Sequence, residues 1–497
     1  MNNEMHLSAE VQLVWEVMTC LGLRTTYDRP DSPCHWFNQH YGPYPAYSSN
    51  VSIPTRQLMQ NTTLTIAARC KGHRFNVPEI LSGCRKAPIM SIGINPNLTA
   101  YQHNVSGTTW CYPYFDDITS YANHFRNRTI NQERFDYDFI KSHLVDGTQT
   151  FARKDGTVEN IAHRNSNIAL TVRYDDEETE VIRLPEHHLL LWDTKDGTNR
   201  FHEGDPIAGE LVLPEDADTM VILEPVGYYK RFQTMIERFV SKGDSALRNS
   251  RVRLGEDASQ GDMVACASPG WNAYFPDTVR EGVVEECVRK RKYFSRQLIQ
   301  SRPSLIVFSG NAALQMFQDV FKNNIHPEID ENLTTYQLLQ RSLREPYWLE
   351  FGGEEDSHFS SRLVFSPHFS YGDSFDAGCR LSTSDWTLFQ EKFPGDSERI
   401  VASKKKKDTF NDGICIYINP NDADDVSDLG AEARNFLKNL YIDPIDTIAE
   451  IMLDEYSAGR LVLDEKGEHF VRTNGPCQFC KNGLFALESG CRYDKQV

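Results

Sequence analysis

The sequence predicts an α/β protein whose core is a largely parallel sheet between two layers of helices. Short apolar segments alternate with segments of helical spacing over residues 86–395, and each apolar segment runs into a loop or a helix. This alternation is typical of parallel strands joined by crossover helices. The predicted core strands are 88–94, 263–266, 305–309 and 363–366. In such sheets ligands bind at the carboxyl ends of the strands.

The segments that flank the core strands are predicted to be mainly helical. Residues 7–22 have helical apolar spacing, with Ser8 as the cap and a glycine at the end. We expect this helix, and the loops that follow it, to form an N-terminal extension over residues 1–85. A second helix is expected over 228–241, and residues 430–460 also have helical spacing within a C-terminal extension over 396–497.

Residues 150–225 differ from the rest of the core. Apolar and polar residues alternate there with a period of two, and Asp/Gly turns separate the alternating segments. The four segments are 168–174, 181–184, 189–192 and 209–213. The pattern predicts a small antiparallel β insertion within the core.

The composition narrows the possible classes of protein. With 497 residues the chain is long enough for two or three folded units. A net charge of -18 argues against non-specific coating of nucleic acid, although one face can still be locally basic. No run of about eighteen apolar residues occurs, and the polar start lacks a signal-peptide pattern, so we expect a cytoplasmic protein with no membrane partner. The oligomeric state stays open.

The first motif is Gly93-Ile-Asn-Pro96, at the end of a predicted strand. It resembles the first active-site motif of the mismatch-specific and thymine branches of the uracil-DNA glycosylase superfamily. The resemblance implies that Asn95 binds and orients the attacking water. Because cleavage of the glycosidic bond passes through an oxocarbenium-like sugar, a weak but well-placed nucleophile is sufficient.

The second motif comprises residues 262–270 (DMVACASPG), Cys287, Tyr293–Gln297 and Arg302–Ala313. It resembles the iron–sulfur uracil-DNA glycosylases in composition, order and spacing. The resemblance implies the three-layer fold of that superfamily and a basic helix over 281–300 that faces DNA. The predicted DNA contacts on this helix are Arg289, Arg291, Lys292 and Arg296.

The same resemblance implies a [4Fe–4S] cluster, because the family binds one through four cysteines. Two of the cysteines correspond to Cys266 and Cys287. The family's other pair, a C-x-x-C, lies near the N-terminus, whereas the only such pair here is Cys477/Cys480. We therefore expect these four residues to hold the cluster. A zinc site that includes Cys491, or uncoordinated cysteines, remain alternatives.

The third motif is residues 364–372 (VFSPHFSYG), which resembles the family's second active-site motif with the Pro and His transposed. The resemblance implies that His368 stabilises negative charge on the departing base. Phe369 and Tyr371 are predicted to fill the gap left by the flipped nucleotide, with Phe375 as a further candidate. An aromatic residue of the 110–115 segment is expected to stack on the base; the candidates are Tyr112, Tyr114 and Phe115.

Asp262 bears on the identity of the base. The iron–sulfur enzymes have an Asn at the corresponding position, and its amide suits uracil. An ionised carboxylate only accepts hydrogen bonds, so it matches the N4 amino group of cytosine and opposes O4 of uracil, whereas a protonated Asp262 could still accommodate uracil. Excision of ordinary cytosine would destroy the host genome, which favours a modified cytosine such as the glucosylated hydroxymethylcytosine of phage DNA.

The leading hypothesis is thus a monofunctional DNA glycosylase that leaves an abasic site, in anti-phage defence. No lysine occupies an evident nucleophile position, so no strand cutting is expected. A base-excision repair glycosylase for uracil or mismatched thymine is one alternative. A catalytically inactive DNA-sensing module on the same fold is another, and the presence of both Asn95 and His368 argues against it.

Overall fold

The structure of the chain is a computed structural model, and it describes part of the sequence. The described residues are 9–18, 20, 22, 32–34, 78–94, 96, 100–103, 107–110, 122, 125–126, 129, 151–152, 156–164, 167–174, 179–185, 192–193, 198–199, 206–207, 213–214, 227–266, 271, 276–351, 358–408, 413–472 and 474.

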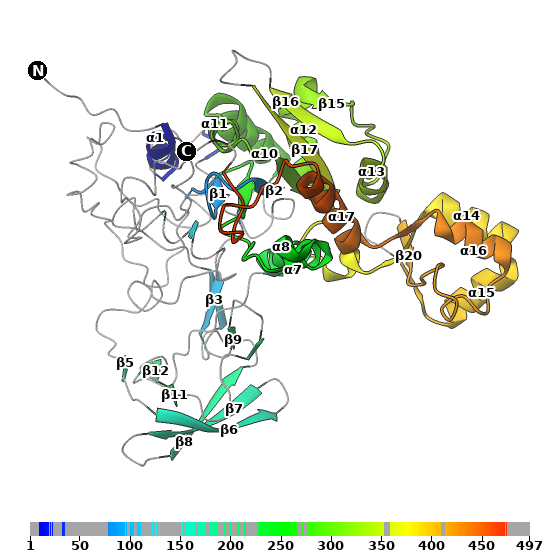
Figure 1. Ribbon diagram of the computed structural model, residues 1–497, viewed down its shortest axis with the longest axis horizontal. Helices are drawn as coiled ribbons and strands as arrows, with labels where there is room; N and C mark the ends of the chain where they lie inside the picture. Colours follow the sequence, from blue (N-terminus) through cyan, green and yellow to red (C-terminus); the bar gives the residue numbers. More distant parts are fainter. Residues whose placement is uncertain are drawn as a thin grey trace, which may run out of the picture. The chain divides into compact units, whose positions relative to one another are not determined.

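The protein is α/β, and its main sheet has seven strands in the order β1-β13-β2-β14-β17-β16-β15 (Figure 1). Two neighbouring pairs, β13/β2 and β14/β17, are parallel. The outer pairs β1/β13, β16/β17 and β15/β16 are antiparallel. The prediction of an α/β protein with a mostly parallel sheet and a small antiparallel sheet is confirmed. The chain divides into two compact units.

The first unit contributes three strands of the main sheet, which are β1 (Leu81–Ser82), β2 (Ile89–Gly93) and β13 (Ala258–Asp262). Its helices are α1 (Ala9–Met18), α10 (Asp277–Val284) and α11 (Tyr293–Ser301). The predicted N-terminal helix and the strand at 88–94 are confirmed. Strand β2 is buried along its whole length, as expected for a central parallel strand.

The predicted strand at 263–266 is wrong in position, because β13 ends at Asp262. Its sequence, Ala-Ser-Gln-Gly-Asp, has low β-propensity, and pairing with β1 and β2 on both sides overrides that propensity. Gly261 permits close packing there: a Cβ at this position would lie 3.1 Å from a ring carbon of Phe294 and 3.3 Å from the sulfur of Met90.

The predicted basic helix over 281–300 is interrupted. A π-helix, η4 (Glu285–Lys290), follows α10, and Lys292 takes a left-handed conformation (φ 54°) before α11 begins. A π-helical turn is rare and is frequently found at functional sites. Cys287 lies within this turn.

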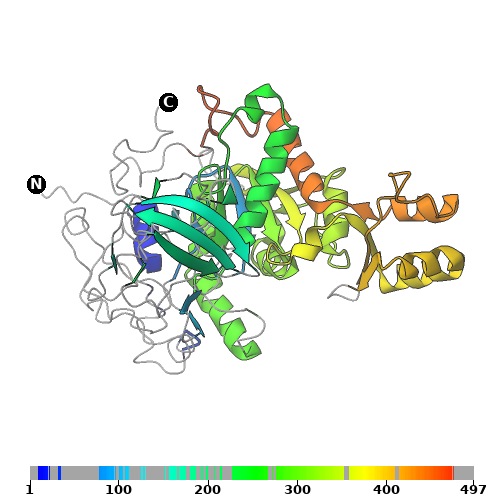
Figure 2. The same cartoon turned by 90° about the horizontal axis from the view of Figure 1, so that it is seen from below.

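The first unit also contains the β insertion. Strands β6 (Gly156–Arg164), β7 (Asn167–Tyr174), β8 (Thr179–Pro185) and β11 (Pro206–Ile207) form an antiparallel sheet in the order β11-β6-β7-β8. Figures 1 and 2 show the three long strands side by side as a twisted ribbon. The same unit contains three separate two-stranded antiparallel sheets among the described residues: β3 (Ala100–His103) with β4 (Gly107–Trp110), β5 (Phe151–Ala152) with β12 (Leu213–Pro214), and β9 (Trp192–Asp193) with β10 (Thr198–Asn199).

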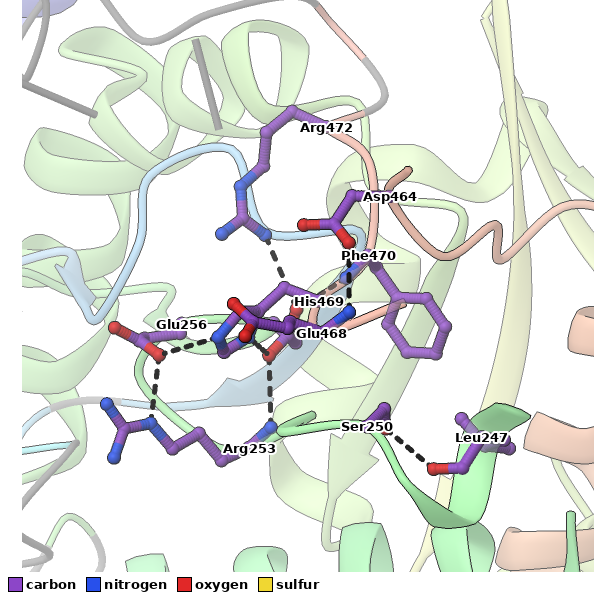
Figure 3. A network of polar contacts seen from close by, with 10 residues as sticks. Leu247, Ser250, Arg253, Glu256, Asp464, Glu468, His469, Phe470 and Arg472 are labelled. Carbon is purple, nitrogen blue, oxygen red and sulfur yellow. Dashed lines mark hydrogen bonds and ion pairs between the residues drawn. The ribbon is translucent and has the colours of Figure 1, made fainter. Parts of the chain in front are cut away.

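A strap at residues 464–474 is held in the first unit by a buried polar network (Figure 3). The imidazole of His469 contacts Asp257 through Nδ1 at 2.8 Å and Glu256 through Nε2 at 3.5 Å. The N–H of Phe470 donates to Asp257 at 2.8 Å. Burial opposes ionisation of Glu256, but the hydrogen bond and charge of Arg253 hold the pKa of Glu256 below its usual range.

The second unit contributes β14 (Leu305–Ser309), β15 (Ile325–His326), β16 (Tyr347–Phe351) and β17 (Phe359–Ser366) to the main sheet. The predicted strands at 305–309 and 363–366 are confirmed. The helices of this unit include α8 (Ser245–Arg248), α12 (Asn311–Phe321), α13 (Thr335–Ser342) and α17 (Pro444–Ser457). Helix α7 (Gly227–Lys242), which confirms the helix expected at 228–241, belongs to this unit from Arg231 onward. Two short 3-10 turns are η5 (Lys322–Asn324) and η7 (Gly372–Phe375).

A small antiparallel sheet within the second unit has the order β19-β20-β18-β21. Its strands are β18 (Gly378–Ser382), β19 (Lys406–Asp408), β20 (Gly413–Ile416) and β21 (Tyr441–Ile442). Helices α14 (Thr383–Lys392), α15 (Pro394–Ala402) and α16 (Ala431–Lys438) share one apolar core with it. The segment expected to be helical over 430–460 is thus two helices separated by β21.

Candidate functional site

In the first unit, polar groups gather where β2 and β13 end. The two strands are parallel, and the register pairs Asp262 with Gly93. The N–H groups of Met263 and Val264 donate to the carbonyls of Gly93 and Ile94 at 3.1 Å and 2.7 Å. The structure therefore holds Asp262 beside the last residues of β2, directly before position 95.

The Asp262 carboxylate is buried and oriented by a side-chain relay. The Gln260 amide nitrogen donates to Oδ1 of Asp262 at 3.3 Å, and the Gln260 oxygen accepts from the Ser91 hydroxyl. Gly93 leaves room for this arrangement: a Cβ there would lie 2.6 Å from Asp262 Oδ1 and 2.9 Å from Gln260 Nε2. Glycine is thus the residue that lets the carboxylate occupy the strand end.

In the second unit, the ends of β14 and β17 are joined by backbone and side-chain hydrogen bonds. The N–H of Gly310 donates to the carbonyl of Ser366 at 2.9 Å. The N–H of Phe369 donates to the Ser309 hydroxyl at 3.1 Å. Gly310 has φ +85°, and a Cβ there would lie 3.0 Å from Cβ of His368. These contacts fix the backbone that carries His368.

His368 is half-buried two residues after β17. Its Nδ1 accepts a hydrogen bond from the N–H of Ser370 at 3.3 Å. Burial lowers the pKa of the imidazole from its usual 6.5, because desolvation disfavours the charged ring. The neutral ring with Nδ1 as acceptor carries its proton on Nε2. His368 is therefore prepared to donate a hydrogen bond without carrying a positive charge.

The two aromatic residues after His368 face different environments. Phe369 is 1% exposed and stacks on Phe232, with ring centroids 5.3 Å apart. Its burial does not agree with the predicted direct contact to DNA; Phe369 instead anchors the turn. Tyr371 is 60% exposed, and its ring lies 5.1 Å from that of His368. Tyr371 is thus the aromatic of this motif that reaches solvent.

A group of four buried cysteines lies in the first unit, which we call the thiol group: Cys20, Cys34, Cys266 and Cys287. Each of the four thiols interacts electrostatically with the other three. Burial, together with this mutual repulsion, raises the pKa of Cys34 and Cys266 well above the usual range and that of Cys287 to about 12. Without a cation between them, four thiolates at this place are unfavourable.

Several groups position the sulfur atoms. The N–H of Ala265 donates to the sulfur of Cys287 at 3.4 Å, and the Tyr293 hydroxyl donates to that of Cys20 at 3.6 Å. Hydrogen bonds to sulfur are a common feature of iron–sulfur sites. The turn that carries Cys34 packs on α10, where a Cβ at Gly282 would lie 2.7 Å from Cβ of Pro33.

The donor set fits an iron–sulfur cluster, since four cysteines supply the four thiolates that such a cluster needs. Among the described residues, no three His, Cys, Asp or Glu side chains are close enough together to hold a single metal ion.

Arg291 lies against the thiol group and not on the open surface. Its guanidinium pairs with Glu286 at 2.7 Å, and the Cys20 thiolate helps to hold the pKa of Arg291 above its usual range despite burial. A Cβ at Gly22 would lie 3.2 Å from Nε of Arg291 and 3.3 Å from the sulfur of Cys34. Arg291 therefore lies as a charge partner of the thiol group, and its predicted DNA contact stays a prediction.

The other predicted DNA contacts differ in exposure. Arg296 pairs with Glu16 of α1 at 2.6 Å, which ties α1 to α11. Arg289 is 51% exposed and pairs only loosely with Glu285, at 3.4 Å. Lys292 is exposed at the left-handed turn between η4 and α11. Arg289 and Lys292 are therefore the two members of the predicted set that present charge to solvent.

Several predicted site residues lie outside the described residues: Asn95, Tyr112, Phe115, Cys477 and Cys480. Conversely, sequence reasoning missed Cys20 and Cys34. The structure places both beside Cys266 and Cys287, more than 200 positions later in the chain. The spacing of Cys20 and Cys34, with thirteen residues between them, hides the pair from a search for C-x-x-C.

The described features define an α/β protein of two compact units, with polar groups at the carboxyl ends of parallel strands and a buried thiol group. Comparison of the chain with protein-family models, curated proteins and solved structures gives no match. Within the described part of the chain, the helices are too short or too polar to span a membrane.

Proposed function

We propose that the chain is a monofunctional DNA glycosylase that hydrolyses the N-glycosidic bond of a modified cytosine and leaves an abasic site. The observation that carries the proposal is His368, a neutral imidazole after the end of a parallel strand with Nδ1 engaged by the Ser370 N–H. A fixed neutral donor suits a leaving group on which negative charge develops as the bond breaks.

In the proposed reaction His368 donates from Nε2 to the O2 atom of the departing base, and this hydrogen bond strengthens as charge accumulates there. Asn95 holds the water that attacks the sugar carbon. An oxocarbenium-like sugar reacts with a weakly activated nucleophile, so an amide that only positions the water is sufficient. Tyr371, as the exposed aromatic of the motif, fills the space that the flipped base leaves in the duplex.

Asp262 supports cytosine over uracil as the parent base. Its carboxylate is buried, and the Gln260 amide fixes one of its oxygens. An ionised carboxylate accepts from the N4 amino group of cytosine and repels O4 of uracil, and the penalty is large in a buried place. Because the host must keep its own cytosine, we propose a modified cytosine of foreign DNA as the substrate.

The thiol group is proposed to hold a [4Fe–4S] cluster through Cys20, Cys34, Cys266 and Cys287. This set replaces the expected pair Cys477/Cys480 with two cysteines that interact electrostatically with Cys266 and Cys287. When bound, the cluster supplies structural cross-linking and no redox step. The cysteines come from the segment after α1, the loop after β13 and the π-helical turn, so a bound cluster would link these three segments. Arg291 supplies a positive charge beside them.

The test uses three DNA duplexes that contain uracil, cytosine or glucosylated hydroxymethylcytosine, followed by alkali cleavage of abasic sites. We expect cutting of the glucosylated duplex alone. His368→Gln should lower the rate by roughly 100- to 1000-fold. His358→Gln is the matched control, because His358 is exposed in the same unit and should leave the rate unchanged.

Each other outcome has a defined meaning. Cutting of the uracil duplex alone would return the protein to base-excision repair and overturn the modified-cytosine proposal. No cutting of any duplex would favour a DNA-binding module without catalysis. Asp262→Asn further distinguishes a modified-cytosine enzyme from a uracil enzyme, because this substitution should move the substrate preference toward uracil. An unchanged preference would show that Asp262 does not recognise the base.

A further inference from the structure

We infer that Arg231 of α7 binds a backbone phosphate of the DNA strand beside the loop formed by residues 367–376, which we call the His368 loop. The inference rests on the proposed function, because it takes DNA as the ligand. It adds a contact that none of the three sequence motifs contains.

Arg231 lies directly against this loop. Its guanidinium carbon is 5.2 Å from the centroid of the Phe375 ring, within the range of a cation–π contact. A Cβ at Gly372 would lie 3.2 Å from Nη2 of Arg231, so the guanidinium follows the backbone at the start of η7. The positive charge is therefore placed one residue from the exposed Tyr371.

Arg231 differs from the next basic residues on the same helix, because those residues form ion pairs with carboxylates. Arg238 pairs with Asp446 at 3.0 Å, and Lys242 pairs with Asp446 and Glu450, each at 3.0 Å. No carboxylate among the described residues forms an ion pair with Arg231. The acidic residue nearest in sequence to Gly372 is Asp373, which pairs with Lys407.

The loop that holds Arg231 in place is itself braced. Nη2 of Arg380 donates to the carbonyls of Asp376 and Ser374 at 2.7 Å and 3.3 Å, and the Tyr336 hydroxyl donates to Ser374 at 3.0 Å. Phe369 anchors the other end of the loop by stacking on Phe232, the neighbour of Arg231 on α7. A preorganised loop loses little entropy when it meets a ligand.

Phosphate is the chemistry that fits this placement. A guanidinium offers paired N–H donors that match two phosphate oxygens, and it stacks on an aromatic ring at the same time. When one side chain enters the duplex, the residues beside it come within reach of the flanking phosphates. Contacts to phosphates commonly fix the position and orientation of a protein on DNA. Arg231 would thus fix the strand while Tyr371 replaces the base.

The experiment measures binding of the full chain to a duplex that contains a reduced abasic site, over a series of KCl concentrations. We expect Arg231→Gln to weaken binding by roughly tenfold. It should also lower the slope of log affinity against log salt by about 0.9, the contribution of one phosphate contact. Arg231→Lys should keep most of the slope. Arg344→Gln, at an exposed arginine of the same unit, is the matched control and should change neither quantity.

The salt slope separates a phosphate contact from a structural role. If Arg231→Gln weakened binding but left the slope at the wild-type value, Arg231 would only support the loop and the inference would be overturned. If the wild-type chain produced no abasic sites but bound the duplex with an Arg231-dependent slope, the inference would stand and the proposed function would fail. Wild-type protein that did not bind the duplex would overturn the inference.

Discussion

The backbone N–H of Ser370 donates to Nδ1 of His368 across 3.3 Å, and this contact places the proton of the neutral imidazole on Nε2. The hydrogen bond is local, since both residues belong to one turn closed by the Tyr371 N–H and the His368 carbonyl at 3.0 Å. The tautomer of the proposed catalytic residue is thus set by the turn that carries it.

His368 makes stability depend on pH with a defined sign. Burial lowers its pKa in the folded state below 6.5, so as the pH falls the unfolded chain binds the proton first. The stability contribution is present above about pH 6.5 and is lost as the pH falls through the folded-state pKa. His368→Gln should therefore lose less stability between pH 7.5 and 5.5 than the wild type, measured by urea unfolding. Parallel loss in both proteins would contradict the prediction.

Iron content tests the thiol group. Cys20→Ala and Cys34→Ala should each lower the iron bound per chain and the visible absorbance after anaerobic purification, because a cluster needs four thiolates. Cys379→Ala is the control, since Cys379 is equally buried but lies in the other unit. Full iron content in both N-terminal variants, with loss in a Cys477→Ala variant, would restore the ligand set expected from the sequence.

Gly93→Ala should impair the proposed reaction without unfolding the protein. A methyl group at this position would lie 2.6 Å from Asp262 Oδ1, so the carboxylate must move. A displacement of this size costs catalysis roughly 100-fold. The rate on the glucosylated duplex measures the effect. In an Asp262→Ala background the added alanine should cost less, because the carboxylate is gone and only the Gln260 amide, 2.9 Å from the new methyl group, still has to move. An equal loss there would show that the clash with Asp262 is not the cause.

The strap at 464–474 should depend on Asp257. This carboxylate is fully buried and accepts from Phe470 and Arg253 while it contacts His469. Asp257→Ala leaves those groups without their acceptor and should lower the free energy of unfolding by about 3–5 kcal/mol. Chemical denaturation measures the loss. Asp277→Ala, at an exposed carboxylate of the same unit, should cost less than about 1 kcal/mol.

The sequence predicted the elements whose signal is local. Apolar runs bounded by turns identified β2, β14 and the end of β17, and helical spacing identified α1 and α7. The alternation in 150–225 identified the antiparallel insertion, because side chains of a half-buried strand alternate between two faces. His368 and Asp262 were singled out by the resemblance of their motifs; the predicted strand at 263–266 would have put Asp262 before a strand, whereas β13 ends at Asp262.

Only the tertiary structure decided the features that depend on contacts between residues distant in the chain. Strand β13 forms from weak β-formers because β1 and β2 pair with it on both sides. The thiol group joins Cys20 and Cys34 to two cysteines more than 200 positions later, and no spacing rule reaches that far. Arg291 has the side chain of a surface residue, and Phe369 was expected at the DNA from its motif, yet packing turns Arg291 toward the thiols and Phe369 onto Phe232. Residue type and local period are written in the sequence, whereas burial and charge partners arise only when distant segments meet.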